Sequence, residues 1–369
     1  MTGVDTAADA ADIAQLVHVA ERFLAEQWPL EAEQPVGGVP PDRARDLWKK
    51  AAQLGWAWIA WGECPEQAAP TLAALFSALG RHPAPIPLAD LAISLPILAA
   101  VDGTEVLAEF ADGDRLLAFA TRPDESHSEH DVWAGVELAD GRLTGNKIAV
   151  PSGVAADAFV VSAASSDGPC FVLIERDQPG VQVEPMRSYD RLDLLAELTL
   201  RDVSGVVLAR GSAAERAARS IATLVRVATA AELAGLASGA VRLAIDYGTQ
   251  RVQFGRPIAS FQAMKHLLAD AWIDVYASES AALAGARRVA SAANETDARY
   301  AADLALSFTV GASRRALEAS LQAHGGIGFT LDYQLNWYFN RTLSHSAVAG
   351  SPRGARLALG RATLEERFQ

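Results

Sequence analysis

The chain has 369 residues, of which 50% are hydrophobic and 21% charged, and its formal net charge at pH 7 is −13. A chain of this length buries one large core or folds into two or three contiguous domains. The acidic balance argues against a protein that binds a nucleic-acid backbone, because that binding depends on many Lys and Arg contacts to phosphate.

The sequence also argues against several other classes of protein. No apolar run reaches the roughly 20 residues that a membrane-spanning helix needs, since Asp90 and Pro96 interrupt even the run from Leu88 to Val101. The first ten residues lack the basic and apolar pattern of a signal peptide. The two cysteines, Cys64 and Cys170, have no metal-ligand spacing. We therefore expect a cytoplasmic protein with no metal site and no membrane contact.

Residues 1–114 are predicted to form an N-terminal helical domain. Apolar residues recur at three-to-four spacing in segments such as Ile13 to Leu24 and Leu47 to Leu54. Pro40-Pro41-Asp42 favours a helix start, because proline is tolerated in the first turn. The tryptophans Trp56, Trp58 and Trp61 are predicted to pack at a helix end under a loop; a ligand-stacking surface is the alternative.

Residues 115–210 are predicted to form a small β-domain, most simply a barrel. Short apolar runs such as Ala158 to Ala163 and Cys170 to Ile174 alternate with turn signals such as Asp140-Gly141 and Gln178-Pro179-Gly180. From residue 211 to 369 the chain returns to long Ala- and Leu-rich periodic segments, which predict a helical bundle. The expected fold is mainly α with a middle β-domain.

Two segments of the last domain carry residues suited to a cofactor. Arg251-Val252-Gln253-Phe254-Gly255-Arg256-Pro257 has the features of a helix end, with Gly255 and Pro257 as stop signals. The following residues, 261–270, interleave polar and apolar side chains close to this arginine pair. A cluster of basic, aromatic and amide groups at a helix junction suits a diphosphate and a flat ring.

This region resembles the acyl-CoA dehydrogenase family. Arg251 to Ile258, Phe261-Gln262 and Lys265-His266 match its Arg-x-Gln-Phe-Gly-x-Pro-Ile, Phe-Gln and Lys-His elements in order, and Gln322 to Gly328 matches its Gln-x-x-Gly-Gly-x-Gly element. The likeness extends more loosely over nearly the whole chain. It includes residues 140–150, with Lys147, which resemble the turn before a flavin-facing strand. The resemblance implies a helical domain, a β-barrel and a four-helix bundle.

The resemblance also implies a cofactor, a substrate class and partners. In this family FAD oxidises an acyl-CoA thioester and passes electrons to an acceptor such as an electron-transferring flavoprotein, and a neighbouring subunit completes each FAD site. Arg251 corresponds to the arginine that reaches the FAD pyrophosphate of the neighbour, with Gln253 and Phe254 beside it. Gln322, Gly325 and Gly326 correspond to residues at the adenine-ribose end, where glycine lets the backbone approach a ligand.

The chain departs from the family where the chemistry is done. The family removes an α-proton with a glutamate, but Ala349 and Val225 occupy its two usual positions. Glu232 lies two helical turns beyond Val225, and Asp332 follows the glycine element, so both are candidates for a displaced base. For each, a capping or inter-helix polar contact is the simpler interpretation.

The flavin-facing strands are altered as well. Thr121 is retained as a possible flavin contact, but Arg122 stands where the family has an acid, and residues 148–152 lack the usual aromatic.

Three hypotheses follow. The chain is the subunit without a base in a heteromeric acyl-CoA dehydrogenase, as in actinobacterial enzymes that act on steroid-type thioesters; the partner is then homologous and a heterotetramer is expected. Alternatively, it is a self-sufficient homo-oligomeric dehydrogenase with a displaced carboxylate. The third hypothesis is a non-catalytic scaffold, which the joint presence of Arg251, Gln253, Gln322 and the glycines disfavours.

Overall fold

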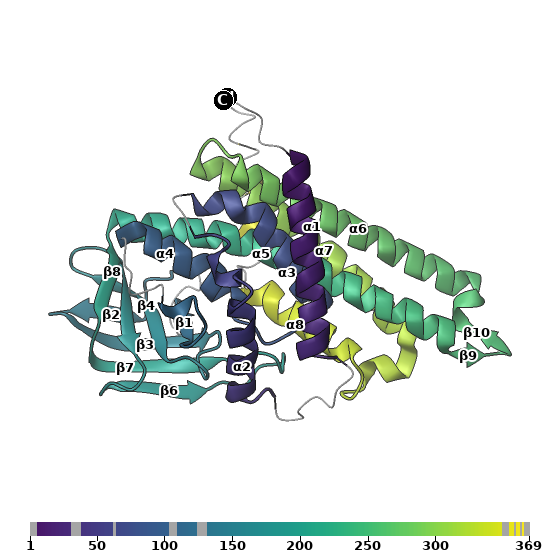
Figure 1. Ribbon diagram of the computed structural model, residues 1–369, viewed down its shortest axis with the longest axis horizontal. Coiled ribbons are helices and arrows are strands. Elements are labelled where there is room, and N and C mark those ends of the chain that lie inside the picture. The colour runs from purple at the N-terminus through teal and green to yellow at the C-terminus, as the bar shows by residue number, and fades with distance from the viewer. Residues whose placement is uncertain are drawn as a thin grey trace. The chain divides into compact units, whose positions relative to one another are not determined.

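The computed structural model describes residues 6–30, 38–61, 64–102, 109–123, 131–348, 354–357, 359–361 and 364 (Figure 1). Its helices of eight residues or more are α1 (Thr6–Gln27), α2 (Pro41–Ala52), α3 (Ala69–Arg81), α4 (Leu95–Asp102), α5 (Ser212–Gln250), α6 (Gln262–Ala290), α7 (Glu295–His324) and α8 (Leu335–Val348). The main strands are β1 (Leu117–Ala120), β2 (Val136–Ala139), β3 (Arg142–Val150), β4 (Ala158–Ser165), β5 (Cys170–Glu175), β6 (Val181–Pro185), β7 (Ala196–Ser204) and β8 (Val206–Arg210). The predicted succession of helices, strands and helices is confirmed.

The chain forms two compact units, and each unit is made of stretches that are separate in the sequence. One unit contains residues 1–36, 67–84 and 225–369, and the other contains residues 37–66 and 85–224. The four helices that precede the strands are therefore divided between the units. Helices α1 and α3 belong to the first unit, and α2 and α4 belong to the second. Helix α5 begins in the second unit and continues into the first.

The second unit is built on an eight-stranded sheet. The strand order is β6-β7-β3-β2-β4-β5-β8, and β1 pairs in parallel with β4, Leu117 lying opposite Ala158. Strands β1, β4 and β5 are buried on nearly every residue, which explains their continuous apolar runs. The other pairings are antiparallel except that between β2 and β4.

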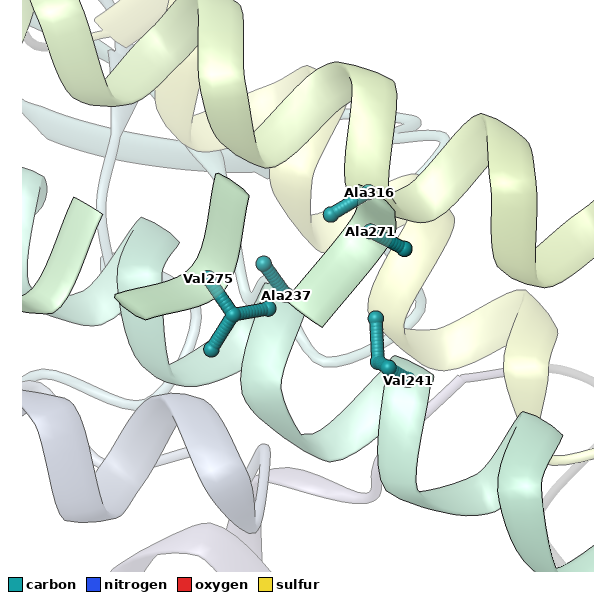
Figure 2. Packing of buried hydrophobic residues seen from close by; sticks show 5 residues of the cluster. All are labelled: Ala237, Val241, Ala271, Val275 and Ala316. Carbon is teal, nitrogen blue, oxygen red and sulfur yellow. The ribbon is translucent and has the colours of Figure 1, made fainter. Parts of the chain in front are cut away.

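The first unit is a helical bundle around the second part of α5. Ala237 and Val241 of α5 pack against Ala271 and Val275 of α6 and against Ala316 of α7, and all five are buried (Figure 2). Small side chains let the helices approach closely. A Cβ added at Gly235 would lie 2.1 Å from the carbonyl oxygen of Ser77, so α3 and α5 meet at backbone distance.

Helix α5 is the one helix among the described residues that is long and apolar enough to cross a membrane. It has 39 residues, and 72% of its most apolar stretch is buried within the protein. That burial is expected of the central helix of a bundle, which is apolar on all sides.

Candidate cofactor-binding site

The first motif lies on a two-stranded hairpin beyond the end of α5. Strands β9 (Val252–Gln253) and β10 (Arg256–Pro257) pair antiparallel, and Phe254-Gly255 forms the two-residue turn between them (Figure 1). Phe254 and Gly255 have φ of 52° and 79°. Positive φ at both central residues is the pattern of a type I′ turn, which suits glycine but is unfavourable for phenylalanine. Phe254 is nevertheless 92% exposed, and its ring meets that of Phe261 edge-on with centroids 6.1 Å apart, so packing within the chain offsets only part of that strain.

Two arginines flank this turn and have different surroundings. The guanidinium of Arg256 lies 4.0 Å from the ring centroid of Phe261, a cation–π contact that holds the hairpin against the start of α6. Arg251 is exposed, and its guanidinium pairs with no carboxylate among the described residues. Gln253 is exposed too, and its side-chain amide donates to the neighbouring carbonyl of Val252 at 2.7 Å. Arg251 is therefore available to an anion.

The second motif is an open turn at the end of α7. Residues Gly325–Phe329 form a short 3-10 turn, and Gly325 has φ of 63°. A Cβ added at Gly325 or Gly326 would meet no atom of the chain within 4 Å. Gln322 and both glycines are exposed. Packing within this chain therefore gives no reason for a glycine at position 326, whereas the close approach of a ligand or another chain does.

A cluster of three rings joins the two motifs, which are about seventy residues apart in the sequence. The ring of Tyr247 stacks on that of His324 with centroids 4.7 Å apart, and Tyr333 packs against both. Tyr247 precedes Arg251 by one helical turn, and its carbonyl oxygen accepts a hydrogen bond from the Arg251 N–H at 2.8 Å. His324 immediately precedes Gly325. Desolvation lowers the pKa of His324, so the imidazole is neutral near pH 7.

These residues fit an extended dinucleotide such as FAD. An exposed planar guanidinium suits a diphosphate, and a glycine turn with open space above it admits a ligand to the backbone. Arg251, Gln253 and Phe254 would hold one part of such a ligand, and Gln322, Gly325 and Gly326 the other.

Neither Val225 nor Glu232 provides a carboxylate that is free to accept a proton. Val225 is half-buried and has no acid–base group, and Ala349 lies outside the described residues. Glu232 is buried between two basic side chains: Arg341 Nε donates to Oε1 at 2.8 Å, and Nδ1 of His345 lies 2.9 Å from Oε2. Burial opposes ionisation, but the charges and hydrogen bonds of His345 and Arg341 lower the pKa of Glu232 to about 2. These contacts favour the inter-helix polar interpretation, since such a carboxylate is a weak base.

Asp332, the other candidate, is exposed on the turn that follows Gly325–Phe329. It forms no ion pair among the described residues. The structure therefore leaves Asp332 accessible.

Two buried ionisable groups of the second unit, Lys147 and Asp90, were not among the site residues predicted from the sequence. Lys147 is fully buried, and its ammonium donates to the carbonyl oxygens of Ala134, Val132 and Thr121 at 2.7, 2.8 and 3.4 Å. Burial lowers the pKa of Lys147 to about 7. Asp90 lies in a π-helical turn, accepts a hydrogen bond from the N–H of Phe119, and has its pKa raised to about 8 by burial. The one available sequence signal was an acid inside the apolar run from Leu88 to Val101.

These two groups hold the end of β1 from both sides. Asp90 binds the N–H of Phe119, and Lys147 binds the carbonyl of Thr121, two residues further on. Ile148 also donates its N–H to the carbonyl of Arg122 at 3.0 Å. Thr121 is thus fixed by its backbone, although the acid and the aromatic expected near it are absent.

Comparison with known proteins gives the same assignment for the helical region. Residues 216–364 match the family model of the acyl-CoA dehydrogenase C-terminal domain. The acyl-CoA dehydrogenase FadE27 of Mycobacterium tuberculosis is 28% identical over 337 residues, which cover 87% of this chain and 88% of FadE27. Acyl-CoA dehydrogenase IpdE2 of the same organism is 38% identical over 133 residues, a stretch that spans 36% of this chain and only 39% of IpdE2.

Solved structures resemble the chain over nearly its whole length. A variant of the Tcur3481-Tcur3483 steroid ACAD is 28% identical, with a TM-score of 0.81 and coverage of 98% of this chain and 99% of that one. The ChsE4-ChsE5 complex from Mycobacterium tuberculosis has 24% identity, a TM-score of 0.78 and coverage of 96% and 97%. The latter likeness concerns the fold alone.

Proposed function

We propose that this chain, a divergent member of the acyl-CoA dehydrogenase family, is the subunit without a catalytic base in a heteromeric FAD-dependent acyl-CoA dehydrogenase. The observation that supports the proposal is that the chain keeps the groups suited to a dinucleotide but lacks a free carboxylate at the position of the base. The groups suited to a dinucleotide, Arg251 and the open Gly325-Gly326 turn, are exposed and joined through Tyr247 and His324. The position of the base at Val225 holds no acid, and the nearby carboxylate of Glu232 is engaged by Arg341 and His345.

In this proposal the chain's own residues bind and orient the cofactor. Arg251 neutralises diphosphate oxygens with two parallel N–H donors, and Gly326 allows the ligand to approach the backbone. FAD would supply the acceptor for the hydride that leaves the β-carbon of the thioester. The α-proton would pass to a carboxylate of the partner chain, because position 225 holds a valine and the carboxylate of Glu232 is bound by Arg341 and His345.

A homologous partner subunit is supported by an exposed apolar row on α7. Tyr300, Leu304 and Phe308 recur every four residues, so they share one helix face, and they are 42%, 53% and 46% exposed. Apolar side chains grouped in this way mark an interface in a protein without a membrane contact. The name of one structural relative, the Tcur3481-Tcur3483 steroid ACAD, gives two components.

The remaining assignments follow from the family. We assign an acyl-CoA substrate in lipid or steroid metabolism, an electron-transferring flavoprotein as the electron acceptor, and a cytoplasmic location. The relatives named above as acyl-CoA dehydrogenases and as a steroid ACAD support the substrate class.

The deciding experiment compares the chain alone with the chain co-expressed with each homologous chain encoded beside it. Flavin absorbance, FAD per chain and acyl-CoA-dependent reduction of an artificial electron acceptor are measured for each preparation. We expect FAD and turnover only with the correct partner, and loss of turnover when the partner's glutamate is changed to glutamine. Full FAD occupancy with turnover by the lone chain would overturn the heteromer.

The second candidate is the self-sufficient dehydrogenase with a displaced base. The exposure of Asp332 beside the glycine turn favours it over Glu232. In an active homo-oligomer, Asp332→Asn would then abolish turnover while FAD stays bound. A scaffold without cofactor is disfavoured, because a scaffold has no need for the exposed Arg251 or for a glycine at an open position 326.

A further inference from the structure

The cation–π contact of Arg256 with Phe261 holds the hairpin against the start of α6, but it does not involve the Gly325-Gly326 turn. The hairpin of Val252 to Pro257 is exposed throughout, and the Gly325-Gly326 turn has open space around it. A ligand that uses both motifs needs them at a constant separation, because binding groups must be held within about 0.5 Å of the productive geometry. Some other part of the unit must therefore set that separation.

The three-ring cluster joins the motifs through Tyr247. The Tyr247 carbonyl accepts the Arg251 N–H at 2.8 Å, which ends α5 at a defined point. The Ile258 N–H in turn donates to the Arg251 carbonyl at 2.9 Å, which closes the base of the hairpin. The first motif is thus tied by backbone hydrogen bonds to the residue that carries the central ring.

The same ring contacts both ends of the second motif. His324 precedes Gly325–Phe329 and stacks on Tyr247 with an interplanar angle of 29°. Tyr333 follows the turn and meets Tyr247 edge-on, with centroids 6.3 Å apart, and His324 at 5.0 Å. The glycine turn is therefore pinned on both sides to one residue of α5.

The orientation of His324 is itself restrained. Its Nδ1 lies 2.7 Å from the carbonyl oxygen of Ser320, one turn earlier on α7, and the ring is buried. Aromatic pairs of this kind contribute about 0.5–1.5 kcal/mol beyond the burial of their surface. The cluster therefore connects the end of α7 to the end of α5 through packed rings.

We propose that Tyr247 is a positioning residue for the FAD site, which holds Arg251 and the Gly325-Gly326 turn at a fixed separation through His324 and Tyr333. The identity of the ligand rests on the proposed function. The ring contacts that join the two motifs do not depend on it. Tyr247 acts through its ring and carbonyl and touches no ligand. Its phenol hydroxyl is dispensable, because the contacts that join the motifs involve the ring and the backbone.

The test uses the complex of this chain with its partner and three variants. Tyr247→Leu removes the ring, Tyr247→Phe retains it, and Val241→Ala is the matched control. Val241 is a buried residue of the same helix, in the cluster of Figure 2, so its truncation lowers stability without touching the rings. Thermal unfolding measures stability, and FAD titration followed by flavin fluorescence measures affinity.

We expect Tyr247→Leu to weaken FAD binding at least tenfold, and Tyr247→Phe and Val241→Ala to leave it within about twofold. An equal loss in Val241→Ala, or no loss in Tyr247→Leu, would overturn the proposal. Should Tyr247→Leu fail to fold, Tyr333→Leu removes a half-buried ring of the same cluster and is expected to weaken binding in the same direction.

A second readout needs no FAD and separates this proposal from the proposed function. Spin labels on Gln253→Cys and Gln322→Cys, both exposed positions, in a Cys64→Ser background report the distance between the motifs by pulsed electron resonance. We expect one narrow distance distribution when position 247 carries its native tyrosine or the Tyr247→Phe substitution, and a broad one in Tyr247→Leu. An unchanged distribution overturns the positioning role, whereas a wild-type complex without FAD overturns the proposed function alone.

Discussion

Arg341 Nε donates to Glu232 Oε1 at 2.8 Å, and both side chains are buried between helices far apart in the sequence. The pair shows why an acid near an expected catalytic position need not be a base. Its carboxylate is already bound by two basic groups, and its pKa of about 2 makes it a poor proton acceptor.

Glu232→Gln is therefore expected to reduce stability. Because the folded pKa is below the unfolded value of 4.5, the carboxylate stabilises the fold above pH 4.5, and this contribution is lost as the pH falls through about 2. The free energy of unfolding should drop by about 3 kcal/mol at pH 7, and the difference from wild type should shrink toward pH 2. Urea unfolding at several pH values measures it. Exposed Asp332→Asn is the control, and a stable Glu232→Gln protein that had lost only turnover would contradict the assignment.

Gly326→Ala is predicted to separate folding from ligand binding. A Cβ at this position meets no atom of the chain within 4 Å, so the free energy of unfolding should change by less than about 0.5 kcal/mol. FAD affinity of the complex should fall at least tenfold, because the methyl group occupies space needed by the ligand. Gly328→Ala is the contrasting control: its Cβ would lie 3.1 Å from side-chain atoms of His324 and Leu321, which predicts a stability loss instead.

Arg251→Lys tests the planar grip on the diphosphate. Arg251 is exposed and unpaired among the described residues, so its replacement should leave the melting temperature unchanged. Lysine keeps the charge but loses the two parallel donors, and we expect FAD binding weakened about tenfold, equal to about 1.4 kcal/mol. Arg256→Lys, measured by the same titration, should act differently, because Arg256 covers the ring of Phe261 and serves hairpin stability.

Asp90→Asn should remove a pH dependence of stability. Burial raises the folded pKa of Asp90 from 3.8 to about 8, so its contribution is fully present below pH 3.8 and is lost as the pH rises to about 8. The slope is about 1.4 kcal/mol per pH unit within that window. Unfolding free energies at pH 5, 6, 7 and 8 should show a flatter profile in the variant than in wild type. Asp112→Asn, an exposed acid of the same unit, should leave the profile unchanged.

Leu304→Arg should disrupt assembly. The row of Tyr300, Leu304 and Phe308 is predicted to lie in a subunit interface, where a charge is costly to bury. Light scattering should show a smaller assembly, while the melting temperature of the isolated chain stays within about 2 °C because the position is 53% exposed. The control is Arg314→Ala, because Arg314 is an exposed residue of the same helix. Ala319 is not used, because it packs on the core. An unchanged mass for Leu304→Arg would place the interface elsewhere.

Local pattern was sufficient to predict the succession of helices, strands and helices, but not the hairpin of β9 and β10, whose residues were expected to form a helix end. Three-to-four periodicity identified the helices before residue 114 and after residue 211, and alternating runs with turn signals identified the strands between them. The same pattern did not reveal that α1 and α3 group with the C-terminal helices while α2 and α4 group with the sheet. Periodicity shows that a face is buried but not which partner covers it.

The sequence predicted some residues of the candidate site but not others. The basic, aromatic and amide groups near Arg251 were visible in the local sequence, whereas Gln322, Gly325 and Gly326 were predicted only from the resemblance to the acyl-CoA dehydrogenase family. Lys147 and Asp90 were not selected, since nothing in their immediate sequence shows that both are buried around the end of β1.

By itself, then, the sequence determined the likeness to the acyl-CoA dehydrogenase family, the succession of helices, strands and helices, and the lack of an acid at Val225 and Ala349. Only the tertiary structure decided that Glu232 is bound by Arg341, more than a hundred residues away, and that the ring of Tyr247 stacks on His324 beside the glycine turn. The reason is physical: the role of a carboxylate or a ring depends on which charges and surfaces surround it, and long-range packing brings those neighbours together.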